Sequence, residues 1–383
     1  MTAQTRYDLN ALFLFVLLCA ATAADAQFQP QLAKGYFEEV TKLCERDAGK
    51  MWGVSLCGPL VIFDQATGTR VTSQPEPEGP VPRLSGVADG PVTWGGQRWF
   101  SIPTWMLPEK DAAVRQQNLI HGLFHRIQDQ LGLITNDGNN EHLDTLEGRV
   151  WLRLGWRALH RAVESSGSDQ TMAIADALAF RHERRRRFPS AAEEERREEI
   201  REGLASYTGI AVWANSPADA RRAAAEAAAG GEAMQNFVGN FEAASGPAYG
   251  VLLDDLLPGW RRQVRATSDL GDMLASAVNK PPTTDFAVAA SRYEGAKVRA
   301  EEEAQRSRAA DPRRRIASTF RGWPRTDDAC PRPRDQRHDG FCRHSRGRYR
   351  LLSQFHTYRS MGPSRRQQRR PEVQRWEHVV RTG

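Results

Sequence analysis

The chain has 383 residues, enough for two or three domains, and its 40% hydrophobic content with 10 Trp is sufficient for a buried core. The formal net charge of +6 hides an asymmetry. Residues 311–383 hold 19 Arg, no Lys and 7 acidic residues, a net charge of +12, so residues 1–310 carry −6. This acidic body excludes the whole chain as a basic nucleic-acid-binding protein.

The N-terminus has the pattern of a secretory signal peptide. Residues 11–24 form an apolar run of 14 residues, and an A-x-A cleavage site ends at Ala26. We therefore predict a signal peptide over residues 1–26 and a secreted or periplasmic mature protein; an uncleaved N-terminal anchor is the alternative. The run is too short to span a bilayer, and because no other apolar stretch approaches 18 residues we expect no transmembrane segment.

The cysteines predict one disulfide in the acidic body. Cys19 lies in the signal peptide, and Cys330 and Cys342 lie in the basic tail, which leaves Cys44 and Cys57. Two thiols in an exported chain favour a disulfide between them. On the chain-entropy relation it would contribute about 3 kcal/mol to stability.

The elements that follow predict a fold of the α+β class that is mostly α. Apolar spacing indicates a helix over residues 33–48 and a β-branched run indicates a strand over 59–64. A loop rich in Pro, Gly and Ser covers 72–92, and 92–102 reads as a hairpin. Helices are then predicted near residues 109–131, 143–166, 170–187, 190–214, 217–228, 230–243 and 246–276, and the pattern stays mostly helical to about 310.

The tail differs in kind from the rest of the chain. From about residue 311 it is rich in Arg and Pro and has no periodic apolar face, so we predict disorder. So abrupt a change is also what a frameshift in GC-rich DNA yields. Arginine pairs and aromatics there would suit nucleic acid or an anionic membrane, but in an exported protein with an acidic body we expect no nucleic-acid partner.

The sharpest motif is the sequence LIHGLFHRIQ at residues 119–128. His121 and His125 are four residues apart, which places both imidazoles on one face of a helix. Leu119, Leu123 and Ile127 form a neighbouring apolar stripe that would hold this helix in the core. The pair is typical of the two-histidine half of a zinc site. The alternative is a pair of helical histidines with ordinary polar partners.

A zinc site with an open position needs a third protein ligand, and three residues are candidates. Glu202 lies in a Glu-Gly-x-Ala-x-Tyr sequence, whereas Glu147 and His142 follow His125 by 22 and 17 residues. If Glu147 is not a ligand, it would accept a hydrogen bond from a ligand imidazole or pair with a neighbouring arginine such as Arg149.

A Glu-Gly-x-Ala-x-Tyr helix downstream of a two-histidine helix resembles the gluzincin class of zinc metallopeptidases. In that class H-E-x-x-H supplies two ligands, and a Glu on a later helix, typically within N-E-G-x-A, supplies the third. The resemblance, shared with uncharacterised exported bacterial proteins, covers roughly residues 35–300, although only the two motifs are specific. It implies a zincin-like helical core, Zn²⁺ held by His121, His125 and Glu202, Tyr207 near the site to stabilise an oxyanion, and a peptide or protein substrate.

The chain departs from this pattern at one position. Gly122 occupies the place of the Glu that acts as general base, whose proton transfer is worth about 10²–10⁴ in rate. Glycine inside a helix also costs up to about 1 kcal/mol relative to alanine, and the sequence suggests no structural gain. Glu198 or Glu199 would act as the general base instead only if the fold places its carboxylate beside the zinc-bound water. Either the protein is a pseudo-peptidase, or Gly122 is a lesion and Gly122→Glu raises activity by orders of magnitude.

Taken together, the sequence predicts a gluzincin-like domain over residues 27–310 that belongs to an exported zinc metallopeptidase-like protein. Its peptide-bond hydrolysis by zinc-activated water would be impaired by the missing base. Two alternatives remain open. One is a non-catalytic zinc-containing protein that binds a peptide or partner, and the other is a metal-free helical envelope scaffold.

Overall fold

The structure is a computed structural model that describes residues 29–82, 84, 90–278 and 285–310. The predicted signal peptide and the predicted disordered tail lie outside these residues. All of these residues belong to one compact unit.

A small mixed sheet forms the N-terminal β element. Its strands are β1 (Leu60–Phe63), β2 (Arg70–Thr72), β3 (Gly90–Trp94) and β4 (Gln97–Pro103). They lie in the order β2-β1-β4-β3, with β1 and β4 parallel and the two outer pairs antiparallel. The predicted hairpin is confirmed, since β3 and β4 are joined at Gly95 and Gly96. The fully buried β1 explains the continuous apolar run of that strand.

Helices make up most of the described chain, which confirms the mostly α, α+β class. They are α2 (Pro30–Asp47), α3 (Ala112–Ile127), α4 (Leu146–Glu164), α5 (Gly167–Arg187), α6 (Ala191–Glu198), α7 (Leu204–Trp213), α8 (Pro217–Gly230), α9 (Phe241–Leu256), α10 (Leu270–Val278), α11 (Phe286–Arg292) and α12 (Gly295–Ala310). Among the described residues, no helix combines the length and the apolar character that a membrane crossing requires.

The prediction of a helix over residues 230–243 is wrong. Only a 3-10 turn at Gly231–Ala233 follows α8, and a loop continues to α9. In that loop Phe237 packs edge-on against Trp156 of α4, with ring centroids 4.9 Å apart. Burial of this aromatic side chain therefore overrides the local helical pattern.

The prediction of one long helix over residues 246–276 is also wrong. The helix α9 begins at Phe241, upstream of the Gly-Pro pair at 246–247, and turns separate it from α10. Phe241 is fully buried with Trp156, so packing extends the helix toward the N-terminus and places Pro247 in its interior.

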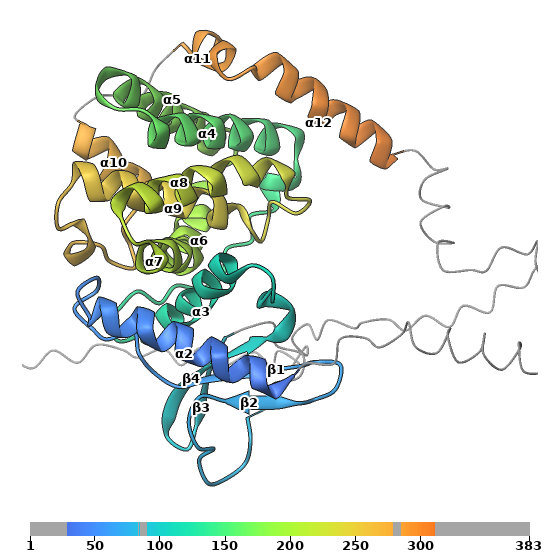
Figure 1. Cartoon of the computed structure of the whole chain (residues 1–383). Helices are drawn as coiled ribbons and strands as arrows, with labels where there is room; N and C mark the ends of the chain where they lie inside the picture. Colours follow the sequence, from blue (N-terminus) through green and yellow to red (C-terminus); the bar gives the residue numbers. More distant parts are fainter. Residues whose placement is uncertain (1–28, 83, 85–89, 279–284, 311–383) are drawn as a thin grey trace, which may run out of the picture. The chain divides into compact units, whose positions relative to one another are not determined.

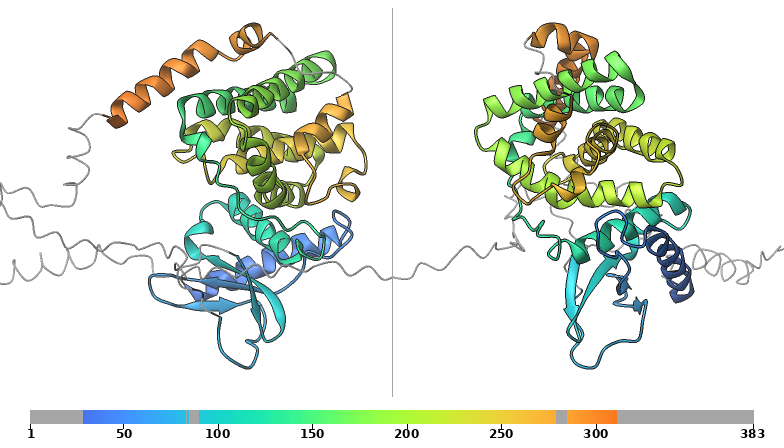
Figure 2. Two further views of the ribbon diagram at one scale, coloured as in Figure 1. Left: turned by 180° about the vertical axis from the view of Figure 1, so that it is seen from behind. Right: turned by 90° about the vertical axis from the view of Figure 1, so that its left-hand side faces the viewer.

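Helix α3 lies between the sheet and the layer of helices formed by α6 to α9, as Figure 1 and both views of Figure 2 show. It contacts β4 on one side and α7 on the other. Leu119, Leu123 and Ile127, the predicted apolar stripe, are all buried. The helix that carries both histidines is therefore held from two sides.

Helix α2 is tied to the segment that follows it by a disulfide. Cys44, near the end of α2, is bonded to Cys57, with Cα atoms 5.2 Å apart. The bond joins residues that are 13 positions apart in the sequence, just before β1.

Candidate metal centre

The centre is built on the antiparallel packing of α3 against α7 and the turn that precedes α7. A Cβ added at Gly209 would lie 2.6 Å from the carbonyl oxygen of Gln117, so glycine permits a close approach of the two helices. One helical turn further, Ser206 Oγ is 3.4 Å from His121 Nδ1. The approach of the two backbones brings the Glu-Gly-x-Ala-x-Tyr segment against the two-histidine helix.

His121, His125 and Glu202 converge in this interface. The Nε2 atoms of the two histidines are 3.0 Å apart, and Glu202 Oε2 lies 3.2 Å from His121 Nε2 and 3.1 Å from His125 Nε2. A tetrahedral zinc ion with ligands at about 2.1 Å has edges of about 3.4 Å, so these three atoms have the spacing of one face of such a site. Their side chains are 18%, 10% and 21% exposed, so each of them keeps some contact with solvent.

A π-helical turn, η3 (Glu199–Gly203), carries Glu202 between α6 and α7. Such turns insert an extra residue into a helix and are frequent at functional sites. Arg201 Nη1 lies 2.8 Å from Glu202 Oε1, the oxygen that does not face the histidines. Oε2 of Glu202 thus faces the two imidazoles, and Oε1 faces the guanidinium of Arg201. The sequence carries no signal for this turn.

Gln128 contacts both halves of the cluster. Its Nε2 donates to the carbonyl oxygens of Ile200 and Arg201 in η3, at 3.1 and 3.0 Å. Because that nitrogen is the donor, Oε1 is an acceptor, and it lies 2.9 Å from His125 Nδ1. His125 therefore carries a proton on Nδ1, and its Nε2 points at Glu202. Gln128 is not among the residues predicted for the site, although its place three residues after His125 puts it on the same helix face.

The pKa values of Glu202 and of Glu242, a buried carboxyl group near the cluster, are shifted in opposite directions. Burial alone would raise the pKa of the Glu202 carboxyl. Without a metal, a proton donated to it by the imidazoles of His121 and His125 outweighs burial and holds the pKa well below the ordinary range. Glu242 at the start of α9 is 5% exposed. Burial, strengthened by the negative charge of Glu202, raises the pKa of Glu242 to about 8. Glu242 is also not among the residues predicted for the site, because no local pattern marks it.

The other candidate third ligands lie elsewhere. Glu147 accepts hydrogen bonds from Trp151 Nε1 at 3.0 Å and from Arg299 at 2.6 and 3.1 Å, so it serves an arginine and not a ligand imidazole. His142 Nε2 lies 2.9 Å from Glu195 Oε1 in a buried pair. Glu202 is the candidate that the structure brings to the two histidines.

The expected contact of Tyr207 with a substrate is not supported. Its side chain is fully buried, and its hydroxyl donates to Asp254 Oδ2 at 2.6 Å. The ring packs on Trp260, with centroids 5.4 Å apart. Tyr207 is a core residue with a satisfied hydroxyl, because its position on α7 faces the interior.

The structure explains why residue 122 is a glycine, although the sequence suggested no structural gain from a glycine inside this helix. A Cβ added there would lie 2.1 and 2.3 Å from Cε1 and Cδ1 of Phe100. Phe100 lies on β4, is fully buried, and stacks on the imidazole of His125 with centroids 6.0 Å apart and planes 16° apart. The space beside the backbone of residue 122 is therefore filled by an aromatic ring.

The two carboxylates considered as replacement bases are engaged elsewhere. Glu198 accepts from the backbone N–H of Gly138 at 2.7 Å and from Arg201 at 2.8 Å. Glu199 is buried in an ion pair with Arg181. Neither has the suitable geometry that replacement of the base would require.

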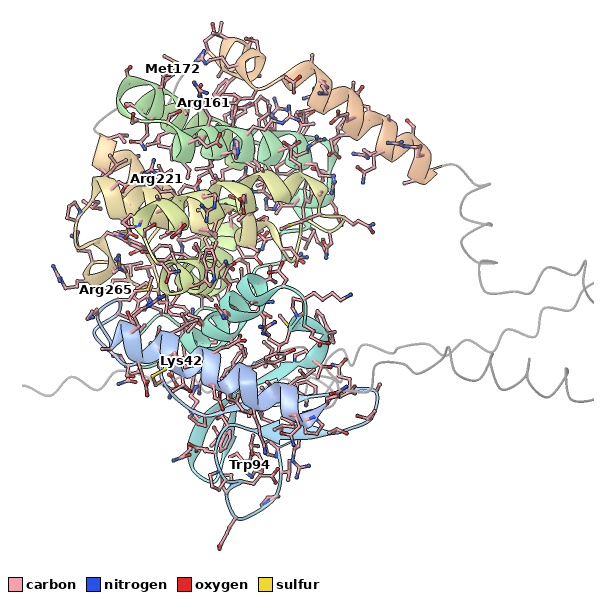
Figure 3. All side chains as sticks on the ribbon, in the orientation of Figure 1. Lys42, Trp94, Arg161, Met172, Arg221 and Arg265 are labelled. Atoms are coloured by element: carbon pink, nitrogen blue, oxygen red, sulfur yellow. A yellow bond between two sulfur atoms is a disulfide. The ribbon has the colours of Figure 1, made fainter. Side chains whose placement is uncertain are left out.

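A second hollow lies beside α11, away from this cluster. It is lined by Arg161 and Met172, whose side chains are labelled in Figure 3, and by Arg292. Its charges are paired already: Arg161 with Asp169 at 3.4 Å, and Arg292 with Asp176 at 3.0 Å. The hollow therefore offers no unbalanced charge to a ligand.

Comparisons with family models, with curated proteins and with solved structures find no match to this chain.

Proposed function

We propose that the protein binds Zn²⁺ through His121, His125 and Glu202, in a gluzincin-like site that lacks a general base and does not hydrolyse peptides. The observation that carries the proposal is the convergence of three donor atoms within 3.0–3.2 Å of one another, from helical segments 77 residues apart. Two imidazoles and a carboxylate are the donor set of many zinc sites that keep an open position.

The tautomer of His125 supports a cation at this point. With its proton on Nδ1, the neutral imidazole presents the Nε2 lone pair to the oxygen of Glu202. Two lone pairs at 3.1 Å repel each other unless a cation lies between them. Without a metal the site would need a proton in its place, either a second one on His125 or one on His121 Nε2, which lies 3.0 Å from His125 Nε2 and 3.2 Å from Glu202 Oε2. A zinc titration distinguishes these two states.

The absence of hydrolysis follows from the residues around the site. Bound zinc would act as a Lewis acid and lower the pKa of a coordinated water. Proton transfer needs a base as well, and Gly122 supplies none. The ring of Phe100 fills the adjoining space, while Glu198 and Glu199 are held by other partners. This favours a non-catalytic protein that uses its zinc to bind a peptide or a partner.

The disulfide supports an exported protein. Disulfides persist in oxidising compartments and are rare in the cytosol. The bond between Cys44 and Cys57 therefore agrees with a signal peptide that directs the chain to the periplasm or the cell exterior.

The test is the zinc content of the purified protein. We expect about one zinc per chain in the parent, and loss of zinc in His121→Ala and Glu202→Ala. Two matched controls should keep it: His182→Ala, an exposed histidine of α5, and Glu147→Ala, the rejected third ligand. A parent without zinc would favour the metal-free scaffold. Peptide hydrolysis that disappears in His121→Ala would contradict the non-catalytic assignment and restore the peptidase hypothesis.

A further inference from the structure

Gln128 hydrogen-bonds both to a ligand histidine and to the turn that carries Glu202. It is 5% exposed, so its amide has little access to water. A buried amide whose three hydrogen bonds all join parts of one site is costly to disturb.

We infer that Gln128 is a positioning residue that prepares the site for a metal ion by acting on both ligand-bearing elements at once. This inference rests on the proposed function. Toward α3, the acceptor Oε1 fixes the proton of His125 on Nδ1 and leaves Nε2 as the donor atom. Toward η3, the donor Nε2 ties down the backbone at Ile200 and Arg201, next to Glu202.

The first half has a general basis in metal chemistry. An imidazole that donates its other N–H to an acceptor is held in one tautomer and one ring orientation, and it becomes a better electron-pair donor. Loss of such an acceptor typically weakens metal affinity by about 10–100-fold.

The second half concerns a turn that needs tethering. The π-helical geometry leaves the backbone of η3 less regular than an α-helix, and Glu202 must point to the histidines from it. Two hydrogen bonds from a side chain of the facing helix fix the distance between the helices at the level of the cluster.

Two substitutions separate these roles. Gln128→Leu removes both, because leucine neither accepts nor donates. Gln128→Glu keeps an acceptor for His125 but cannot donate to the carbonyls of Ile200 and Arg201. Gln130→Leu, the same change two residues on at an exposed position, is the matched control.

The experiment measures the Zn²⁺ dissociation constant of each full-length protein by competition with a chromophoric chelator. It also measures, in the zinc-loaded proteins, the solvent exchange of the His125 Nδ1–H proton by NMR. We expect Gln128→Leu to bind zinc about 10–100-fold more weakly and to exchange this proton faster. Gln128→Glu should bind zinc more weakly than the parent but more tightly than Gln128→Leu, because it keeps the acceptor for His125 and loses the two bonds to η3. Parental affinity in Gln128→Glu would overturn the role of η3, and Gln130→Leu should match the parent.

The outcomes that overturn the inference differ from those that overturn the proposed function. Gln128→Leu with the zinc affinity and exchange rate of the parent would overturn the inference alone. Equal losses in Gln128→Leu and Gln128→Glu would show that the amide acts only through η3 and not through His125, which also overturns it. A parent that binds no zinc would overturn both.

Discussion

Gly122→Ala tests whether the ring of Phe100 leaves no room for a Cβ atom at residue 122. We call two residues related in this way a fitted pair. In an ordinary helix this change stabilises the folded state by up to about 1 kcal/mol. Here the new Cβ would lie 2.1 Å from Phe100 Cε1, whereas carbon atoms in contact are about 3.5–4.0 Å apart. The ring would have to move by more than about 1 Å.

The surroundings of Phe100 leave little room for that movement. It is fully buried on β4, which lies between β1 and β3. Overpacking of a core costs about 1–3 kcal/mol, and a rigid ring on an inner strand favours the upper part of that range. After the gain in helix propensity, we expect Gly122→Ala to lower the free energy of unfolding by about 2 kcal/mol. Gly122→Glu should lower it further and should not create peptidase activity.

The assay is urea unfolding followed by circular dichroism. Gly155→Ala on α4 is the matched control, since a Cβ there would meet only an arginine nitrogen at 3.9 Å; it should stabilise the protein. The double variant Phe100→Ala/Gly122→Ala should show a favourable coupling energy of about 1–3 kcal/mol, because the methyl group would enter the space left by the ring. If Gly122→Ala stabilises the protein as much as Gly155→Ala does, the fitted pair is refuted and the lesion hypothesis regains support.

Three further predictions concern stability. With a pKa of about 8, Glu242 in the folded, metal-free protein keeps a proton that the unfolded chain releases near pH 4.5. The free energy of unfolding should therefore fall by about 1.4 kcal/mol per pH unit as the pH rises from 4.5 to about 8. Glu242→Gln should remove this term, and urea titrations at pH 5 and pH 8 that give the same difference from the parent would contradict it. Arg181→Met leaves the buried carboxylate of Glu199 unpaired and should lower the free energy of unfolding by about 3–5 kcal/mol in urea. Glu199→Gln in the same chain should restore most of this loss, and a double variant as unstable as Arg181→Met would contradict the explanation. Reduction of Cys44–Cys57 should cost about 3 kcal/mol, measured as a lower urea midpoint with dithiothreitol; an unchanged midpoint would argue against the bond.

The predictions that succeeded rest on patterns within one or two turns of the chain. The four-residue spacing of His121 and His125 fixes their common face on any helix, and the hairpin follows from two glycines between apolar alternations. The resemblance to gluzincins singled out Glu202, which the structure brings to the two histidines; its role as a zinc ligand stays a prediction.

What the sequence by itself determined is therefore the class of fold and the two-histidine half of the site, because helical periodicity is a local property. Only the tertiary structure decided the rest. The choice of Glu202 over Glu147 depends on how α7 packs against α3 across 77 residues of chain. The reason for Gly122 depends on a ring from β4, a strand that precedes α3. Contacts between elements distant in sequence come from packing, which no spacing within one element specifies.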